Sequence, residues 1–151
     1  MRPTVVHPGR VPLVDLADDT FIAARPALVA AAVGQPARWR AWWPDLRLTV
    51  ARDRGTKGVQ WVAGSLCTGS GALAGSLEIW LEPCAGGTLL HHYQRLDALP
   101  GRGTPRGRAW AQREWARRSR HWKRHVHLLK DELEDGRAPG ERVQAGRVVV
   151  R

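Results

Sequence analysis

The sequence predicts a two-layer α+β domain, in which a curved antiparallel sheet packs against one long helix. Segments of alternating apolar and polar residues, rich in β-branched side chains, recur between residues 46 and 99. Such segments are typical of a meander of antiparallel strands. The segment 109–136 then places apolar residues at helical spacing, with no glycine or proline before Gly136. A helix with one apolar stripe must bury it, and the meander offers the large apolar face that it needs.

One strand and two short helices are expected before the meander. Residues 14–25 end in an apolar run and predict a strand. The next segment, 26–33, begins with a proline, which suits the first turn of a helix, and Gly34 ends it. A second short helix is predicted at 35–43, because a proline lies near its start and Pro44 follows its end.

Four strands are predicted after these helices, at residues 46–53, 58–64, 76–83 and 88–99. The turn at 54–57 joins the first two of them in a hairpin. The glycine-rich segment 65–75 fits either a bulged strand or a loop, and the role of GSLCTGSG at 64–71 stays open. A loop rich in glycine, proline and arginine, at 100–108, leads to the long helix.

The long helix is expected to bury one side and to expose arginines on the other. Its predicted buried stripe consists of Trp115, Trp122, Val126, Leu129 and Leu133, with Ala111 and Ser119 on the same side. The opposite side carries Arg113, Arg117, Arg120 and Arg124. Arginines in a row can bind phosphates. We interpret this row as a solvated outer face, so nucleic acid is not an expected partner.

Length and composition indicate one folded domain with tails. The chain has 151 residues, of which 43% are hydrophobic, and this content excludes a disordered chain. We expect a flexible arm at 1–12, a single domain at 13–135 and a flexible tail at 136–151. The formal net charge of +10 raises the expectation of an anionic partner without identifying one.

Apolar runs and cysteines bear on the cellular location. No run of apolar residues is long enough for a membrane span, and the first residues lack the clean apolar segment of a signal peptide. We therefore expect a cytoplasmic protein, in which Cys67 and Cys84 are reduced thiols.

Several segments together resemble one known superfamily. They are DDTFIAARPALVAAAV at 18–33, PARWRAWWPDLRL at 36–48, GSLEIWLEP at 75–83, LLHHYQRLD at 89–97 and WKRHVHLLKDELEDGRAPGE at 122–141. The chain is similar to the SRPBCC (START-like) superfamily, and within it to an actinobacterial polyketide cyclase/dehydrase-like branch. The resemblance covers roughly residues 13–135. It implies the helix-grip fold, in which the sheet wraps around the long C-terminal helix and leaves a cavity for an apolar ligand.

Aromatic side chains are the expected walls of that cavity. The candidate cavity residues are Trp42, Trp43, Trp61, Trp115, Ser119, Trp122 and Val126. Tryptophans at helical spacing fit core packing as well as a ligand wall. In the second short helix we expect Trp39 and Trp43 to be buried and Trp42 to lie at the cavity mouth.

Polar residues of the last strand are the tentative catalytic groups, namely His91, His92, Tyr93 and Arg95. Alternation places His91, Tyr93 and Arg95 on one face and His92 on the other, and which face points inward stays open. No Ser or Cys with a His and an Asp forms a recognisable triad. His121 and His125 lie one helical turn apart, but HEXXH is absent, so we expect no metal and no cofactor.

Three functions follow from these observations. The first is the binding of a small hydrophobic ligand, lipid- or polyketide-like, between the long helix and the sheet. The alternative is a polyketide aromatase or cyclase that acts in the same cavity. The third is a basic module for an acidic protein or nucleic acid. The sequence leaves the ligand, any reaction and the oligomeric state undetermined.

Overall fold

The computed structural model describes residues 11–66, 72–99 and 107–135. The predictions for Cys67, for the tail at 136–151 and for most of the arm at 1–12 lie outside the described residues. So do most of the stretch 64–71 and of the loop at 100–108.

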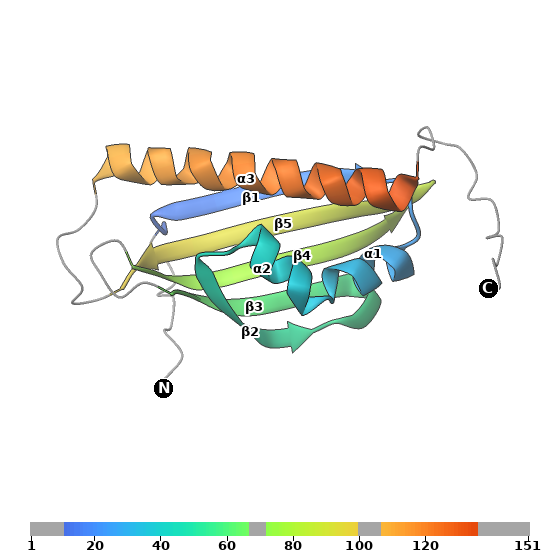
Figure 1. Cartoon of the computed structure of the whole chain (residues 1–151), viewed down its shortest axis with the longest axis horizontal. Coiled ribbons are helices and arrows are strands. Elements are labelled where there is room, and N and C mark those ends of the chain that lie inside the picture. Colours follow the sequence, from blue (N-terminus) through green and yellow to red (C-terminus); the bar gives the residue numbers. More distant parts are fainter. Residues whose placement is uncertain (1–10, 67–71, 100–106, 136–151) are drawn as a thin grey trace.

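The described elements follow the predicted order (Figure 1). They are β1 (Val14–Ile22), α1 (Pro26–Val33), α2 (Pro36–Trp42), β2 (Leu46–Asp53), the short 3₁₀ turn η1 (Gly55–Lys57), β3 (Gly58–Ser65), β4 (Leu73–Cys84), β5 (Gly87–Ala98) and α3 (Arg108–Glu134). The segment 65–75, which the sequence left open, is already in β4 from Leu73 onward.

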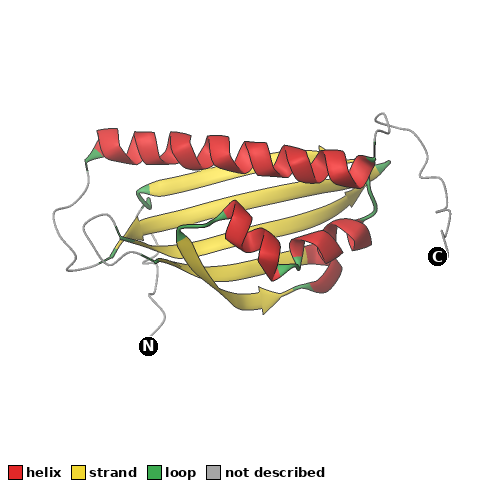
Figure 2. Cartoon of the chain, viewed as in Figure 1, coloured by secondary structure: helices red, strands yellow, loops and turns green. Residues whose placement is uncertain are grey.

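The five strands form one antiparallel sheet in the order β1-β5-β4-β3-β2. All three helices lie on one face of this sheet, with α3 along the β1 side and α1 and α2 over the other half (Figures 1 and 2). The predicted fold class, a curved antiparallel sheet with a long C-terminal helix, is therefore confirmed.

Alternation along β4 and β5 decides which side chains reach the core. Leu77, Ile79 and Leu81 of β4 are buried, as the sequence predicts. On β5 the buried side chains are Leu90, His92, Gln94 and Leu96. The helix-covered face therefore receives His92, and the open face receives His91, Tyr93 and Arg95.

The predicted buried stripe of α3 is confirmed at the centre of the helix, and the prediction is wrong for one residue. Trp122, Val126 and Leu129 are buried against the sheet. Trp115, predicted to be buried with them, is 45% exposed. Its indole Nε1 donates to the backbone oxygen of Asp15 at 3.2 Å, so its side chain lies against β1, the edge strand of the sheet.

Candidate ligand site between α2, α3 and the sheet

Tryptophans fill the space between α2, α3 and the sheet. Trp42 and Trp43 come from the end of α2, Trp61 from β3 and Trp122 from α3, and all four are buried. The rings of Trp43 and Trp122 stack with centroids 5.8 Å apart and planes at 6°. Trp42 meets Trp122 edge to face at 5.7 Å, and Trp43 meets Trp61 at 5.3 Å. Elements far apart in the sequence therefore converge on one aromatic cluster.

A buried histidine of β5 lies against this cluster. The ring of His92 is 4.0 Å from that of Trp122 and 5.3 Å from that of Trp43, between centroids. Its Nδ1 lies 3.0 Å from the carbonyl oxygen of Glu78, and its Nε2 lies 3.0 Å from Nε2 of Gln94. Because a carbonyl oxygen only accepts, Nδ1 carries the proton and Nε2 accepts from the Gln94 amide. Burial lowers the pKa of His92 to about 3, so the ring is neutral.

Three buried polar atoms of this region lack a hydrogen-bond partner among the described residues. They are the indole Nε1 donors of Trp43 and Trp61 and the acceptor Oε1 of Gln94. Gln94 is only 1% exposed. A buried polar atom without a partner costs roughly 1–3 kcal/mol, so each of the three offers a specific bond to a molecule that reaches it.

A small hollow adjoins two of these residues, Trp43 and Gln94. It is lined by Trp42, Trp43, Pro44, Asp45, Gln94, Arg117, Arg118 and His121. Its volume is about 20 Å³, close to the space that one water needs. Ligand pockets for drug-sized molecules measure roughly 300–1,000 Å³. The cavity that was expected between the long helix and the sheet is closed by the tryptophans in the described structure.

Charged side chains form the outer rim of this hollow. Nη2 of Arg118 lies 2.5 Å from Oδ2 of Asp45, and Nη2 of Arg117 lies 3.4 Å from the same oxygen. Oε1 of Glu114 lies 2.9 Å from Nε of Arg118 and 2.6 Å from Nη2 of Arg117. Burial acts to raise the pKa of Glu114, but the Arg117 hydrogen bond and the two guanidinium charges lower it below its usual value.

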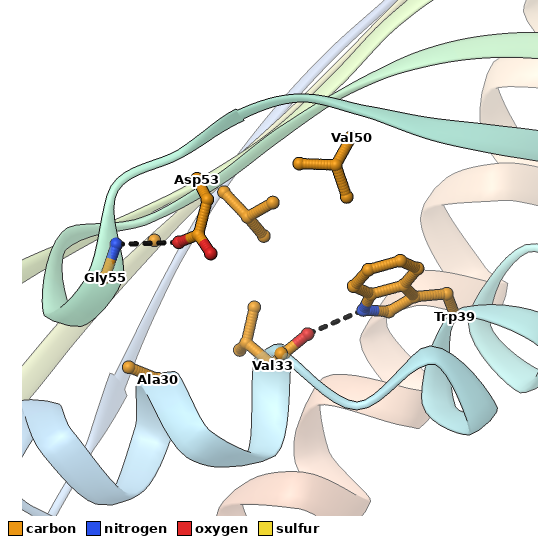
Figure 3. Close-up of a pocket in the computed structure, with 9 residues that line it drawn as sticks. Ala30, Val33, Trp39, Val50, Asp53 and Gly55 are labelled. Atoms are coloured by element: carbon orange, nitrogen blue, oxygen red, sulfur yellow. Dashed lines mark hydrogen bonds between the residues drawn. The ribbon is translucent and has the colours of Figure 1, made fainter.

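A second hollow lies on the other side of α2, between α1 and the β2–β3 hairpin (Figure 3). Its volume is about 80 Å³, and it is lined by Ala30, Val33, Gly34, Trp39, Val50, Asp53, Gly55, Gly58 and Val59. Trp39 Nε1 donates to the Val33 carbonyl at 2.6 Å, and Gly55 N donates to Asp53 Oδ1 at 2.8 Å. These bonds occupy its main polar groups, so the hollow is chiefly an apolar groove.

Several solved structures are similar to this chain in fold. No family model matches the sequence, and no curated protein does. The structure is similar to protein MLL2253 from Mesorhizobium loti, with a TM-score of 0.63 and 14% identity over 82% of this chain and 99% of that one. It is also similar to the Aha1 dimer from Colwellia psychrerythraea, with a TM-score of 0.56 and 16% identity over 83% and 99% of the two chains. An AHSA1-like protein from Rhizobium etli has a TM-score of 0.53 and 20% identity over 91% of each chain.

The chain has the helix-grip fold. Identities this low establish the shared architecture and leave ligand, activity and assembly to be argued from the residues of this chain. The actinobacterial branch and the cytoplasmic location stay predictions. None of the described helices is both long and apolar enough to cross a membrane.

Within this helix-grip domain, most predicted cavity residues meet. Trp42, Trp43, Trp61 and Trp122 form the cluster, and Val126 is buried beside Trp122 on α3. Ser119 is half-buried one turn away. Trp115 is separate from them, as described above.

The prediction for α2 is confirmed for Trp43 and wrong for Trp39 and Trp42. Trp39, expected to be buried with Trp43, is half-buried, and Trp42, expected at the mouth, is buried as well. The helix ends at Trp42, and Trp43 takes φ −136° and ψ 67°. Because Trp43 has left the helical conformation, the i,i+4 spacing no longer places it beside Trp39. The adjacent tryptophans therefore both turn inward.

The four tentative catalytic residues are not brought together. His92 is inside, whereas His91, Tyr93 and Arg95 lie on the open face. There Nδ1 of His91 is 2.6 Å from Asp19 and Nε2 is 2.9 Å from Glu82. Arg95 lies over the ring of Tyr93 at 5.9 Å. The contacts of His91 are cross-strand pairs, and that of Arg95 with Tyr93 lies along β5, all on the open face of the sheet.

Three residues of the site were missing from the predicted set. Gln94 shares a face of β5 with His92, but nothing in the sequence marked its side chain as a ligand group. Glu114 and Arg118 are spaced i,i+4 on α3 and contact each other. Nothing in the sequence marked Arg118 as buried or placed Asp45, which follows the end of α2, against it.

A metal site has no support in the described ranges, where no group of three or more His, Cys, Asp or Glu side chains is placed to hold an ion. The rings of His121 and His125 are 4.4 Å apart. Nε2 of His121 lies 3.2 Å from the Ala41 carbonyl, to which it donates. His121 therefore helps to hold α2 against α3.

Proposed function

We propose that this protein binds a small, flat and largely apolar molecule between α2, α3 and the sheet. The observation that carries the proposal is the pair of unpartnered atoms, Trp43 Nε1 and Gln94 Oε1, buried beside a hollow with tryptophan walls. A ligand with one acceptor and one donor would satisfy both atoms, while its apolar surface would replace tryptophan contacts with ligand contacts.

Access to this site requires the end of α2 to move. Trp42 and Trp43 belong to a short helix of seven residues and to the residue after it. Outside the core, α2 is tied to α3 by polar contacts at the surface, such as the two bonds from Arg38 to Glu132 at 2.6 and 2.9 Å. Surface ion pairs contribute roughly 0–1 kcal/mol each, so these surface contacts add little to the cost of moving α2.

The walls favour a flat ring over a flexible chain. Stacked and edge-to-face contacts between aromatic rings contribute roughly 0.5–1.5 kcal/mol beyond the burial of area. A planar polyketide-like molecule can insert between rings such as Trp43 and Trp122, which are already parallel. A saturated lipid chain gains the apolar burial without these ring contacts.

Catalysis in the same site would depend on His92, since it alone of the four tentative residues faces inward. A general base works best when its pKa lies near the operating pH. The pKa of about 3 makes His92 a weak base at neutral pH. Its two nitrogens are engaged by Glu78 and Gln94. The geometry therefore supports binding better than an aromatase or cyclase reaction.

The test is a titration of the full chain with 2-naphthamide, a flat molecule whose amide offers one acceptor and two donors, followed by tryptophan fluorescence. Replacing Gln94→Leu should weaken binding roughly tenfold, since a net hydrogen bond of about 1.4 kcal/mol is lost. Gln60→Leu on the open face of β3 is the matched control and should leave the affinity unchanged. Decanol serves as the lipid-like probe and should bind more weakly than naphthamide.

Native mass spectrometry of gently purified protein provides an independent readout, because a retained small molecule adds a discrete mass. The proposal fails if neither probe binds and no mass is retained. It also fails if Gln94→Leu and Gln60→Leu weaken naphthamide binding equally while both variants unfold at the wild-type temperature.

A further inference from the structure

Two arginines and two carboxylates close the mouth of the proposed site. Arg117 and Arg118 of α3 both contact Glu114 and Asp45. Glu114 belongs to the same helix as the arginines. Asp45 instead follows Pro44, directly after the tryptophans of α2. The contact between Asp45 and Arg118 therefore joins the segment that must move to the helix that stays.

The two partners differ in their exposure. The side chain of Arg118 is 5% exposed, whereas that of Asp45 is 42% exposed. A buried charge that loses its partner is strongly destabilised, because it retains the cost of leaving water without the compensating attraction. An exposed carboxylate that swings outward is hydrated at once. Breaking this ion pair therefore destabilises the exposed carboxylate of Asp45 little and the buried guanidinium of Arg118 strongly.

We infer that the ligand carries an acidic group, which replaces Asp45 on Arg118 when the mouth opens; this inference rests on the proposed function. The incoming carboxylate restores the ion pair that the movement breaks. The apolar body of the ligand then lies toward Trp43 and Gln94, which line the same hollow as Arg118. A neutral molecule of the same shape leaves Arg118 with Glu114 as its one remaining carboxylate partner among the described residues.

This arrangement makes the ligand class a flat aromatic or polyketide-like acid. It also gives Arg117 a role at the mouth, although Arg118 alone already contacts both carboxylates. Arg117 is 53% exposed and lies 3.4 Å from Asp45. A planar guanidinium binds a carboxylate through two parallel bonds, and an exposed one can meet an anion before the buried one does.

The test compares 2-naphthoate with 2-naphthamide, which share one ring system and differ in charge, by calorimetric titration of the full chain. Naphthoate should bind roughly tenfold more tightly than naphthamide. In Asp45→Asn, which removes the competing carboxylate, naphthoate should gain a further factor of about ten, and naphthamide should change less than about threefold. Asp131→Asn on the exposed side of α3 is the matched control, since it removes the same charge elsewhere.

Each other outcome overturns the inference. Equal binding of the two probes, in the wild type and in Asp45→Asn, would mean that the site takes no acidic group, although the proposed function would stand. An equal gain of naphthoate affinity in Asp131→Asn would assign the effect to overall charge rather than to Asp45. If neither probe binds to any variant, the proposed function itself is wrong and the inference fails with it.

Discussion

Two neighbouring histidines of β5 have opposite surroundings, because successive residues of a strand point to opposite faces. His91 lies between Asp19 and Glu82 on the open face. Burial acts to lower the pKa of His91, but its hydrogen bonds to Glu82 and Asp19 and the charges of these carboxylates raise it above its usual value. His92 lies among tryptophans, and its pKa falls to about 3. Both residues were candidates for the same role, and the pleat of the strand places them on opposite faces.

Replacing His92→Gln should reduce the acid sensitivity of the fold. The folded pKa of about 3 lies below the unfolded value of about 6.5, so the unfolded state binds a proton first as the pH falls. As the pH falls from about 6.5 to about 3, this histidine therefore lowers the free energy of unfolding by roughly 1.4 kcal/mol per pH unit. Urea unfolding at about pH 5 and 7 should show a smaller pH dependence in the variant. An unchanged dependence would mean that His92 is not held neutral.

At the scale of elements, β4 and β5 approach so closely that one position needs glycine. Gly75 lies opposite Leu96 in the register of these strands. A Cβ added there would lie 1.9 Å from the carbonyl oxygen of Arg95, which is backbone and has no freedom to turn away. Gly64 of β3 offers a comparison, since a Cβ there would meet nothing within 4 Å.

Gly75→Ala should therefore destabilise the domain by about 1–3 kcal/mol, the usual cost of forcing atoms into a packed structure. Gly64→Ala, which makes the same chemical change in the neighbouring strand, should lie within about 0.5 kcal/mol of the wild type. Thermal unfolding of the two variants measures the difference. Equal stabilities would contradict the close approach of β4 and β5 at this position.

The helices and strands depend on short-range sequence patterns, and for this reason the predictions of these elements are confirmed. Prolines at the starts of α1 and α2 and the alternation in β4 act locally, so the sequence shows them directly. The inward orientation of both Trp42 and Trp43 is not determined by local sequence. It depends on the non-helical conformation of Trp43 and on the rings of Trp61 and Trp122, which come from β3 and α3.

At the scale of the whole molecule, the order of elements predicted the helix-grip fold but not the volume of its interior. A long helix with one apolar stripe and a meander with one apolar face have few ways to combine. The volume left between them depends on how large side chains from distant elements fill it. Here the tryptophans reduce the hollow beside Gln94 to about 20 Å³. The burial of Arg118 is equally a product of assembly, since it requires Asp45 from another element.

Indole ¹H–¹⁵N spectra with 2-naphthamide test the central claim most directly, because each tryptophan gives its own Nε1 signal. The signals are assigned with single Trp→Phe variants. We expect the Trp43 signal to shift most, since its Nε1 gains an acceptor, while the signal of Trp80 on the open sheet face stays in place. Binding that shifts Trp80 and leaves Trp43 unchanged would contradict a ligand site between α2, α3 and the sheet.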